Sequence, residues 1–213
     1  MRKTTAWYYF LLGAPIIVVA TVIIDLLLFG NIEEFAKENR GIETASFLLL
    51  FYAAVGFLAL APDRGFGASW HVPTVLFMLA ARELDFDKKF LADGVYRAKL
   101  YTRDNPVLHK IIGGAVLFLT FWIIWRLIRR SGPGWLRALR NLDLWAWLML
   151  SALLFVVIAK TIDGAGRKMR RLFDVEVPQN VSNVLVVAEE LMELGFGMLI
   201  VAAIAFWVRD LRS

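Results

Sequence analysis

Five runs of about 20 mostly apolar residues constrain this chain more than any other feature of its sequence. They cover approximately residues 7–29, 44–61, 106–125, 142–162 and 182–207. A helix of about 20 apolar residues can cross the hydrocarbon core of a bilayer, where every backbone amide must be hydrogen-bonded internally. The sequence therefore predicts an all-α fold, a polytopic transmembrane helical bundle that forms a single domain over residues 1–213.

A sixth segment, at about residues 70–84, is shorter than these runs and contains Pro73. Its length allows either a short span or a re-entrant half-helix. Tryptophan and tyrosine concentrate at membrane interfaces. If the segment spans, all eight tryptophans fall at one membrane face, and this coherence favours six spans over five. The eight are Trp7, Trp70, Trp122, Trp125, Trp135, Trp145, Trp147 and Trp207.

The chain contains no cysteine and has a formal net charge of +5. The lack of cysteine excludes disulfides, thiolate nucleophiles and cysteine metal sites. Because the basic residues flank apolar runs, we expect membrane lipids with anionic headgroups as partners, and no nucleic acid. Residues 133–142, in which Trp135 and Leu136 stand beside Arg137 and Arg140, are typical of a helix lying in the headgroup plane.

The orientation in the membrane is indicated in two conflicting ways. On the six-span arrangement, slightly more lysine and arginine lies on the side opposite the termini. The first helix usually dominates orientation, however, and here Arg2 and Lys3 precede it while an acidic loop follows it. We therefore expect both termini in the cytoplasm, and a bacterial-type inner (plasma) membrane as the location.

Three glutamates in the last apolar run, Glu189, Glu190 and Glu193, are costly charges to place in a membrane. An ionisable side chain there costs about 2.5–3.5 kcal/mol on insertion scales, and glutamate is too short to reach the interface as lysine does. At about 100° per residue the three share one helix face, with Gly197 one turn deeper. We expect this face to point into the bundle, with its carboxylates neutralised by cations, a metal or protons.

Further ionisable residues are expected at the same membrane face, because the alternating direction of the spans brings segment ends together. The end of segment 70–84, the end of run 142–162 and the starts of the runs near 106 and 182 should meet there. No cofactor is predicted, although His109 with Glu190 and Glu193 leaves room for a divalent metal. The candidate members of this polar site are Arg82, Glu83, Asp85, Lys160, Asp163, Glu189, Glu190 and Glu193.

Three functions remain open on this evidence. The first is transport or permeation of a proton, a cation or another small solute, for which a bundle this small is expected to form a homo-oligomer. The second is a membrane-embedded enzyme acting on a lipid or lipid-linked substrate, with a glutamate as general base or metal ligand. The third is an assembly or scaffold subunit whose polar cluster pairs with another membrane protein. The sequence contains no P-loop, Gly-x-Ser-x-Gly or His-Glu-x-x-His motif.

Overall fold

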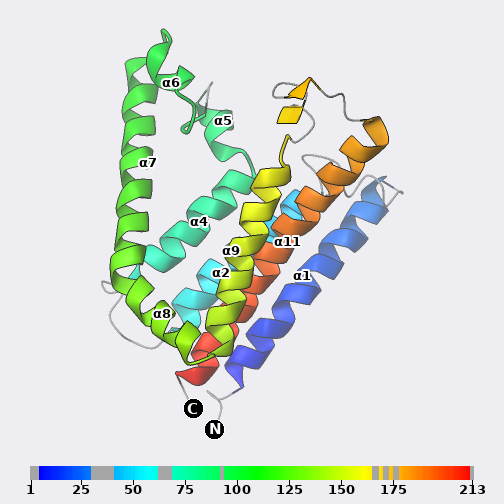
Figure 1. Ribbon diagram of the computed structural model, residues 1–213, viewed down its shortest axis with the longest axis vertical. Coiled ribbons are helices and arrows are strands. Elements are labelled where there is room, and N and C mark those ends of the chain that lie inside the picture. Colours follow the sequence, from blue (N-terminus) through cyan, green and yellow to red (C-terminus); the bar gives the residue numbers. More distant parts are fainter. Residues whose placement is uncertain are drawn as a thin grey trace.

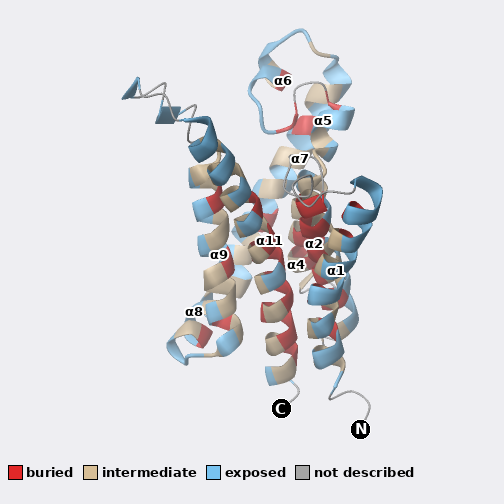
Figure 2. Cartoon of the chain, turned by 90° about the vertical axis from the view of Figure 1, so that its right-hand side faces the viewer, coloured by how far each residue is buried: buried red, intermediate tan, exposed pale blue. Residues whose placement is uncertain are grey.

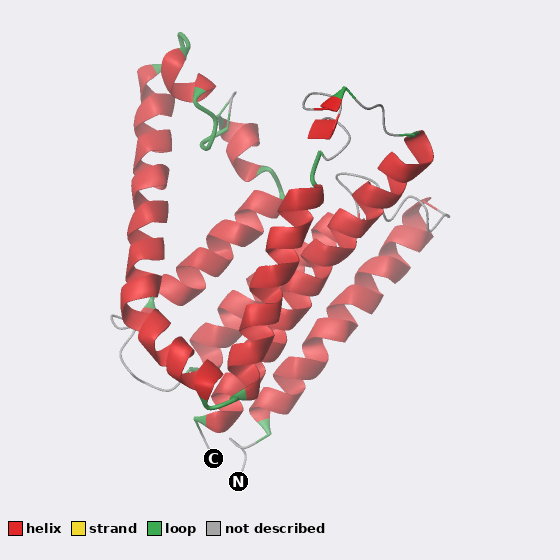
Figure 3. Ribbon diagram, in the orientation of Figure 1, coloured by secondary structure: helices red, strands yellow, loops and turns green. Residues whose placement is uncertain are grey.

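The protein is an all-α bundle, shown as a computed structural model in Figures 1 and 3. The structure describes residues 5–29, 41–61, 69–91, 94–164, 168–169, 173–174 and 178–211. Within these ranges five helices are long and apolar enough to cross a membrane. They are α1 (Ala6–Phe29), α2 (Gly41–Leu60), the continuous helix Val107–Arg140, α9 (Leu144–Ile162) and α11 (Gln179–Asp210).

The sixth segment, at about residues 70–84, forms α4 (His71–Glu83), a helix of 13 residues. At 1.5 Å per residue it is about 20 Å long, less than the roughly 30 Å of a hydrocarbon core. It lies obliquely against α2, and the chain then continues upward through α5 (Phe86–Phe90) and α6 (Lys99–Thr102) (Figure 1). The chain does not turn back after α4. The chain therefore passes six times between the two ends of the bundle, and five of these passes are made by helices long and apolar enough to cross a membrane.

Both ends of the chain lie at the same end of the bundle (Figure 1), as six crossings require. The alternating helix directions bring the eight tryptophans to this end, since each lies near the start or finish of an element there. Direct contacts join several of them to neighbouring helices. Trp207 stacks on Phe57 with ring centroids 5.3 Å apart, and Trp135 Nε1 donates a hydrogen bond of 3.1 Å to the Ala146 carbonyl. We call this the tryptophan end and the other the opposite end.

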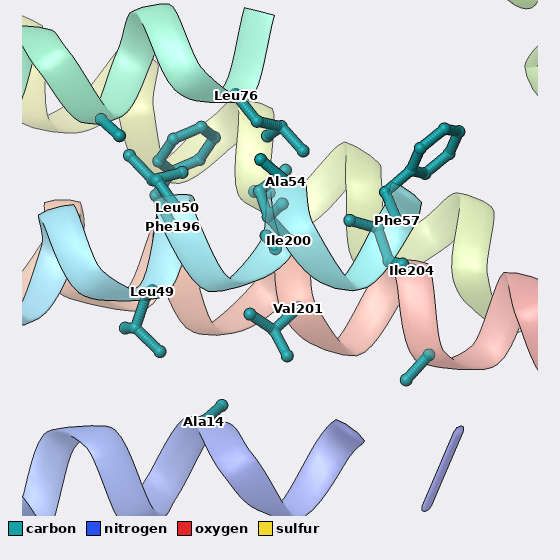
Figure 4. Close-up of a cluster of buried hydrophobic side chains, with 14 of the residues drawn as sticks. Ala14, Leu49, Leu50, Ala54, Phe57, Leu76, Phe196, Ile200, Val201 and Ile204 are labelled. Atoms are coloured by element: carbon teal, nitrogen blue, oxygen red, sulfur yellow. The ribbon is translucent and has the colours of Figure 1, made fainter. Parts of the chain in front are cut away.

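The apolar core lies mainly between α2 and α11, where the buried positions concentrate (Figure 2). In Figure 4, Leu50 and Ile200 approach Leu76 of α4, while Leu49 and Val201 face α1. Helices of a membrane protein approach closely where one of them has a small residue. This holds at Gly197, where an added Cβ would lie 3.1 Å from the Leu49 Cβ.

The helix that begins with α7 (Val107–Arg126) continues further than the sequence predicted. Instead of ending near residue 125, it passes through a π-helical turn, η2 (Leu127–Ser131), into α8 (Gly132–Arg140). A π turn contains an extra residue and changes the direction of the helix axis. As a result α8 turns across the tryptophan end towards α9 (Figure 1). The expected interfacial helix at 133–142 is therefore a continuation of the preceding span.

Candidate functional site

An ion pair at the opposite end of the bundle joins α9 to α11. Lys160, in the last turn of α9, has its Nζ 2.5 Å from Oε1 of Glu193 and 3.8 Å from Oε1 of Glu189. The two glutamates lie four residues apart and so share a face of α11. The side chains are 13% exposed at Glu193 and 37% exposed at Lys160. The lysine therefore stands at the rim of the site, and the glutamate lies further inside.

Glu190 is more buried than either member of this ion pair and is only 6% exposed. Its Oε2 has no hydrogen-bond partner among the described residues. Its nearest charges are of the same sign, since it interacts electrostatically with Glu193, Glu43, Glu189 and Glu83. A buried carboxylate without a partner is costly in its ionised form. Glu190 therefore needs a proton or a bound cation.

The end of α4 and the start of α2 complete the site. Glu83 is the last residue of α4 and interacts electrostatically with Glu193, Lys160, Arg82 and Glu43. Glu43 lies in the first turn of α2. Among the described residues, five carboxylates and two basic side chains therefore interact electrostatically at this end of the bundle. We call this set the carboxylate cluster; its members are Glu43, Glu83, Glu189, Glu190 and Glu193, together with Lys160 and Arg82.

Glu43 was not among the residues expected from the sequence. It precedes the apolar run that begins near residue 44, so it was assigned to the acidic loop before the span. In the structure α2 begins at Gly41, which places Glu43 on the helix. The signal that locates it is the alternation of the spans, since the start of α2 and the end of α4 must lie at the same end of the bundle.

Ser46 lies one turn below Glu43 on α2 and is 1% exposed. Its hydroxyl has no hydrogen-bond partner among the described residues. Glu43 above it interacts with Glu190, and Leu49 below it packs against Gly197, so both neighbours face α11. Because Ser46 lies between them on the helix, it also faces α11. A second polar atom without a partner therefore lies on the inner side of the cluster.

Three other candidates are placed elsewhere. Asp85 has a left-handed backbone, with φ of 48°, and forms a salt bridge of 2.6 Å with Lys88. Asp163 follows the last turn of α9 as its C-terminal cap. His109 lies in the first turn of α7, which stands apart from α11 in Figure 1. The structure therefore does not bring His109 to Glu190 and Glu193. The alternating direction of the spans determines at which end of the bundle a residue lies, but not which helices are neighbours.

Within the described part of the chain, no group of three or more histidine, aspartate or glutamate side chains has a geometry that could hold a metal ion. The carboxylates of the cluster are instead distributed over three helices, with Lys160 between two of them. This arrangement suits the binding of a proton or of one small cation by individual carboxylates. Comparison of the chain with protein-family models, with curated proteins and with solved structures finds no match.

Proposed function

We propose that this integral membrane protein transports protons or small monovalent cations, with the carboxylate cluster as the binding site. The observation that carries the proposal is Glu190. It is a buried acid on a membrane-length helix, and its Oε2 has no partner among the described residues. Ionisable residues inside a membrane are costly and usually mark ion or proton pathways.

The charges of the cluster support a single positive charge as the ligand. Lys160 interacts with Glu193 and, at longer range, with Glu189. Glu190 has no such cation beside it, so one proton or one monovalent cation would neutralise it. The Ser46 hydroxyl adds an oxygen on the inner side of the site. Oxygen atoms are the ligands that hard cations prefer.

An apolar layer separates the cluster from the tryptophan end. Leu50, Phe196 and Ile200 pack together directly along α2 and α11 (Figure 4). In this conformation these packed side chains lie between the cluster and the tryptophan end. Transport therefore requires α2 and α11 to separate in part, so that the site opens alternately to the two sides, as in transporters with a fixed central site.

The proposal is tested by flux into liposomes that contain the purified protein and a trapped pH-sensitive dye. An imposed pH gradient, or a gradient of Na⁺, Li⁺ or K⁺ with a protonophore present so that protons balance the transported charge, should produce a dye signal above that of protein-free liposomes. Glu190→Gln keeps the shape of the side chain but cannot release a proton, and it should lower the rate at least tenfold. Asp104→Asn changes an exposed acid and serves as the matched control.

Two results would contradict the proposal. One is a wild-type protein, correctly folded by circular dichroism, that gives no flux under any of these gradients. The other is a Glu190→Gln protein that gives the wild-type rate. In the second case the cluster would be a structural network, and the transport activity would reside elsewhere.

A further inference from the structure

The tryptophan end carries a net positive charge in the described residues, and this charge lies away from the carboxylate cluster. Its charged residues, within the described ranges, comprise six arginines and two aspartates. One of the aspartates, Asp210, is engaged by Arg209 at 2.9 Å. The opposite end carries the carboxylate cluster and more acidic than basic residues in the described ranges. Among the described residues the net charge is therefore positive at the tryptophan end, where most of the arginines lie on the turn η2 and on α8.

The arginines of this region are exposed and have no carboxylate beside them. Arg129, Arg130 and Arg140 form no salt bridge within the described part of the chain. Arg129 places its guanidinium 5.3 Å from the centre of the Trp125 ring. This contact is a cation–π interaction, and it orients the guanidinium at the level where interfacial tryptophans lie.

The outer face of α8 combines arginine with exposed apolar side chains. Trp135 and Ala138 face the bundle, whereas Leu136, Arg137 and Arg140 lie on the far side and are exposed. Leu142, directly after α8, is 74% exposed and has a left-handed backbone with φ of 60°. A leucine in this conformation is unusual. Its exposure is accounted for when α8 lies at the boundary between headgroups and acyl chains.

The start of the basic turn is held in place from inside. His71 is 2% exposed, its Nε2 lies 3.0 Å from the Ser131 Oγ, and its Nδ1 accepts a hydrogen bond of 3.4 Å from Arg126 Nε. Because Nδ1 accepts, Nε2 carries the hydrogen and donates it to the serine. The histidine thereby fixes the residues on both sides of Arg129 and Arg130. The arginines project from a supported turn rather than from a loose loop.

We infer that η2 and the outer face of α8 bind the phosphate headgroup of anionic phospholipids in the adjoining leaflet. The phosphate supplies the negative charge that Arg129, Arg130 and Arg140 lack, while Leu136 and Leu142 contact the acyl chains. Guanidinium groups suit phosphate because they donate two parallel hydrogen bonds. Each basic residue near an anionic membrane surface strengthens binding about fivefold.

The test measures which lipids stay with the purified protein. The protein is reconstituted in nanodiscs containing phosphatidylglycerol and phosphatidylcholine in equal amounts, and native mass spectrometry counts the lipids that remain bound after release into detergent. We expect the wild type to retain phosphatidylglycerol preferentially. The triple variant Arg129→Gln/Arg130→Gln/Arg140→Gln should lose that preference by at least tenfold.

A matched variant separates this site from a general effect of net charge. Lys89→Gln/Arg97→Gln/Lys99→Gln removes the same charge from exposed residues near the opposite end. It should retain the wild-type preference. Equal loss in both triple variants, or no loss in the arginine variant, would overturn the inference. So would competition by millimolar inorganic phosphate, which would show a site for free anions rather than for lipid.

Discussion

The Nζ of Lys160 lies 2.5 Å from Oε1 of Glu193, and this pair joins the end of α9 to the middle of α11. It neutralises one of the five carboxylates of the cluster and leaves Glu190 behind it. Within the described part of the chain, Lys160 thus pairs with Glu193, whereas Glu190 Oε2 has no hydrogen-bond partner. This arrangement gives two predictions about the cluster, and the packing of Gly56 and the hydrogen bonds of His71 give two more.

Removing one partner of the Lys160–Glu193 pair should destabilise the protein more than removing both. Lys160→Met removes the cation that pairs with Glu193, and we expect a loss of about 1–2 kcal/mol, reduced by the partial exposure of the lysine. The double variant Lys160→Met/Glu193→Gln should recover part of that loss. Thermal unfolding in detergent measures the cycle, and additive single-variant effects would show that the two side chains do not interact.

Cation binding at Glu190 should become weaker as the pH falls. A proton and a cation compete for the same carboxylate, so where the acid is mostly protonated a tenfold rise in proton concentration lowers the apparent cation affinity about tenfold. A bound cation raises the free energy of unfolding, by roughly 2.7 kcal/mol at a concentration 100 times its Kd. The rise in melting temperature caused by Na⁺ or Li⁺ should therefore be larger at pH 8 than at pH 6.

The Glu190→Gln variant is the control for that titration. It should fold, since the amide removes a buried charge, and its melting temperature should not respond to the cation at either pH. A cation effect of equal size in Glu190→Gln and in the wild type would assign the binding to other carboxylates.

Gly56 should tolerate no larger residue. A Cβ at this position would overlap the ring of Phe10 on α1, which is 6% exposed. Gly56→Ala should cost about 1–3 kcal/mol, because overpacking displaces either the ring or the helix. Gly114→Ala is the matched control, since nothing lies within 4 Å of its added Cβ, and it should be neutral or stabilise by up to about 1 kcal/mol. Equal melting temperatures for the two variants would contradict the close contact.

Loss of the His71 side chain should loosen the π turn. His71→Ala removes the partner of both the Ser131 hydroxyl and Arg126 Nε, which lie 3.0 Å and 3.4 Å from its ring nitrogens. We expect a loss of about 1–3 kcal/mol and faster hydrogen exchange of the amides in Leu127–Ser131. Ser131→Ala removes only one of the two contacts and should have a smaller effect. Unchanged exchange in His71→Ala would show that the turn is held by other residues.

The membrane-spanning architecture was predictable because a bilayer imposes a minimum length on each apolar run. The gathering of the tryptophans at one end was also predictable, since it follows from the alternation of helix directions when the segment at 70–84 passes from one end to the other. The ion pair of Lys160 with Glu193 required one further step, the expectation that a charged helix face points into the bundle. The inward position of Glu193 was inferred from the free-energy cost of an ionisable side chain in a membrane rather than from any motif.

Other features could not be obtained from the sequence in this way. The lateral order of the helices decides that His109 lies apart from Glu190, and alternation carries no information about it. The structure has α2 beginning at Gly41, before the apolar run, whereas the apolar run alone leaves Glu43 in the loop. The π turn at Leu127–Ser131 depends on one additional residue within a helical pattern, and His71, which packs against it, comes from a distant segment.

Thr5 directly precedes α1 and Leu211 directly follows α11, so both lie at the tryptophan end, which has a practical consequence for experiments on intact membranes. A fluorophore or affinity tag attached near either residue reports from the side that the apolar layer separates from Glu193. A membrane-impermeant quencher that reaches such a label is therefore on the wrong side to reach the carboxylates. Labelling from the two sides in turn would establish the sidedness of the protein and the accessibility of its site in a single preparation.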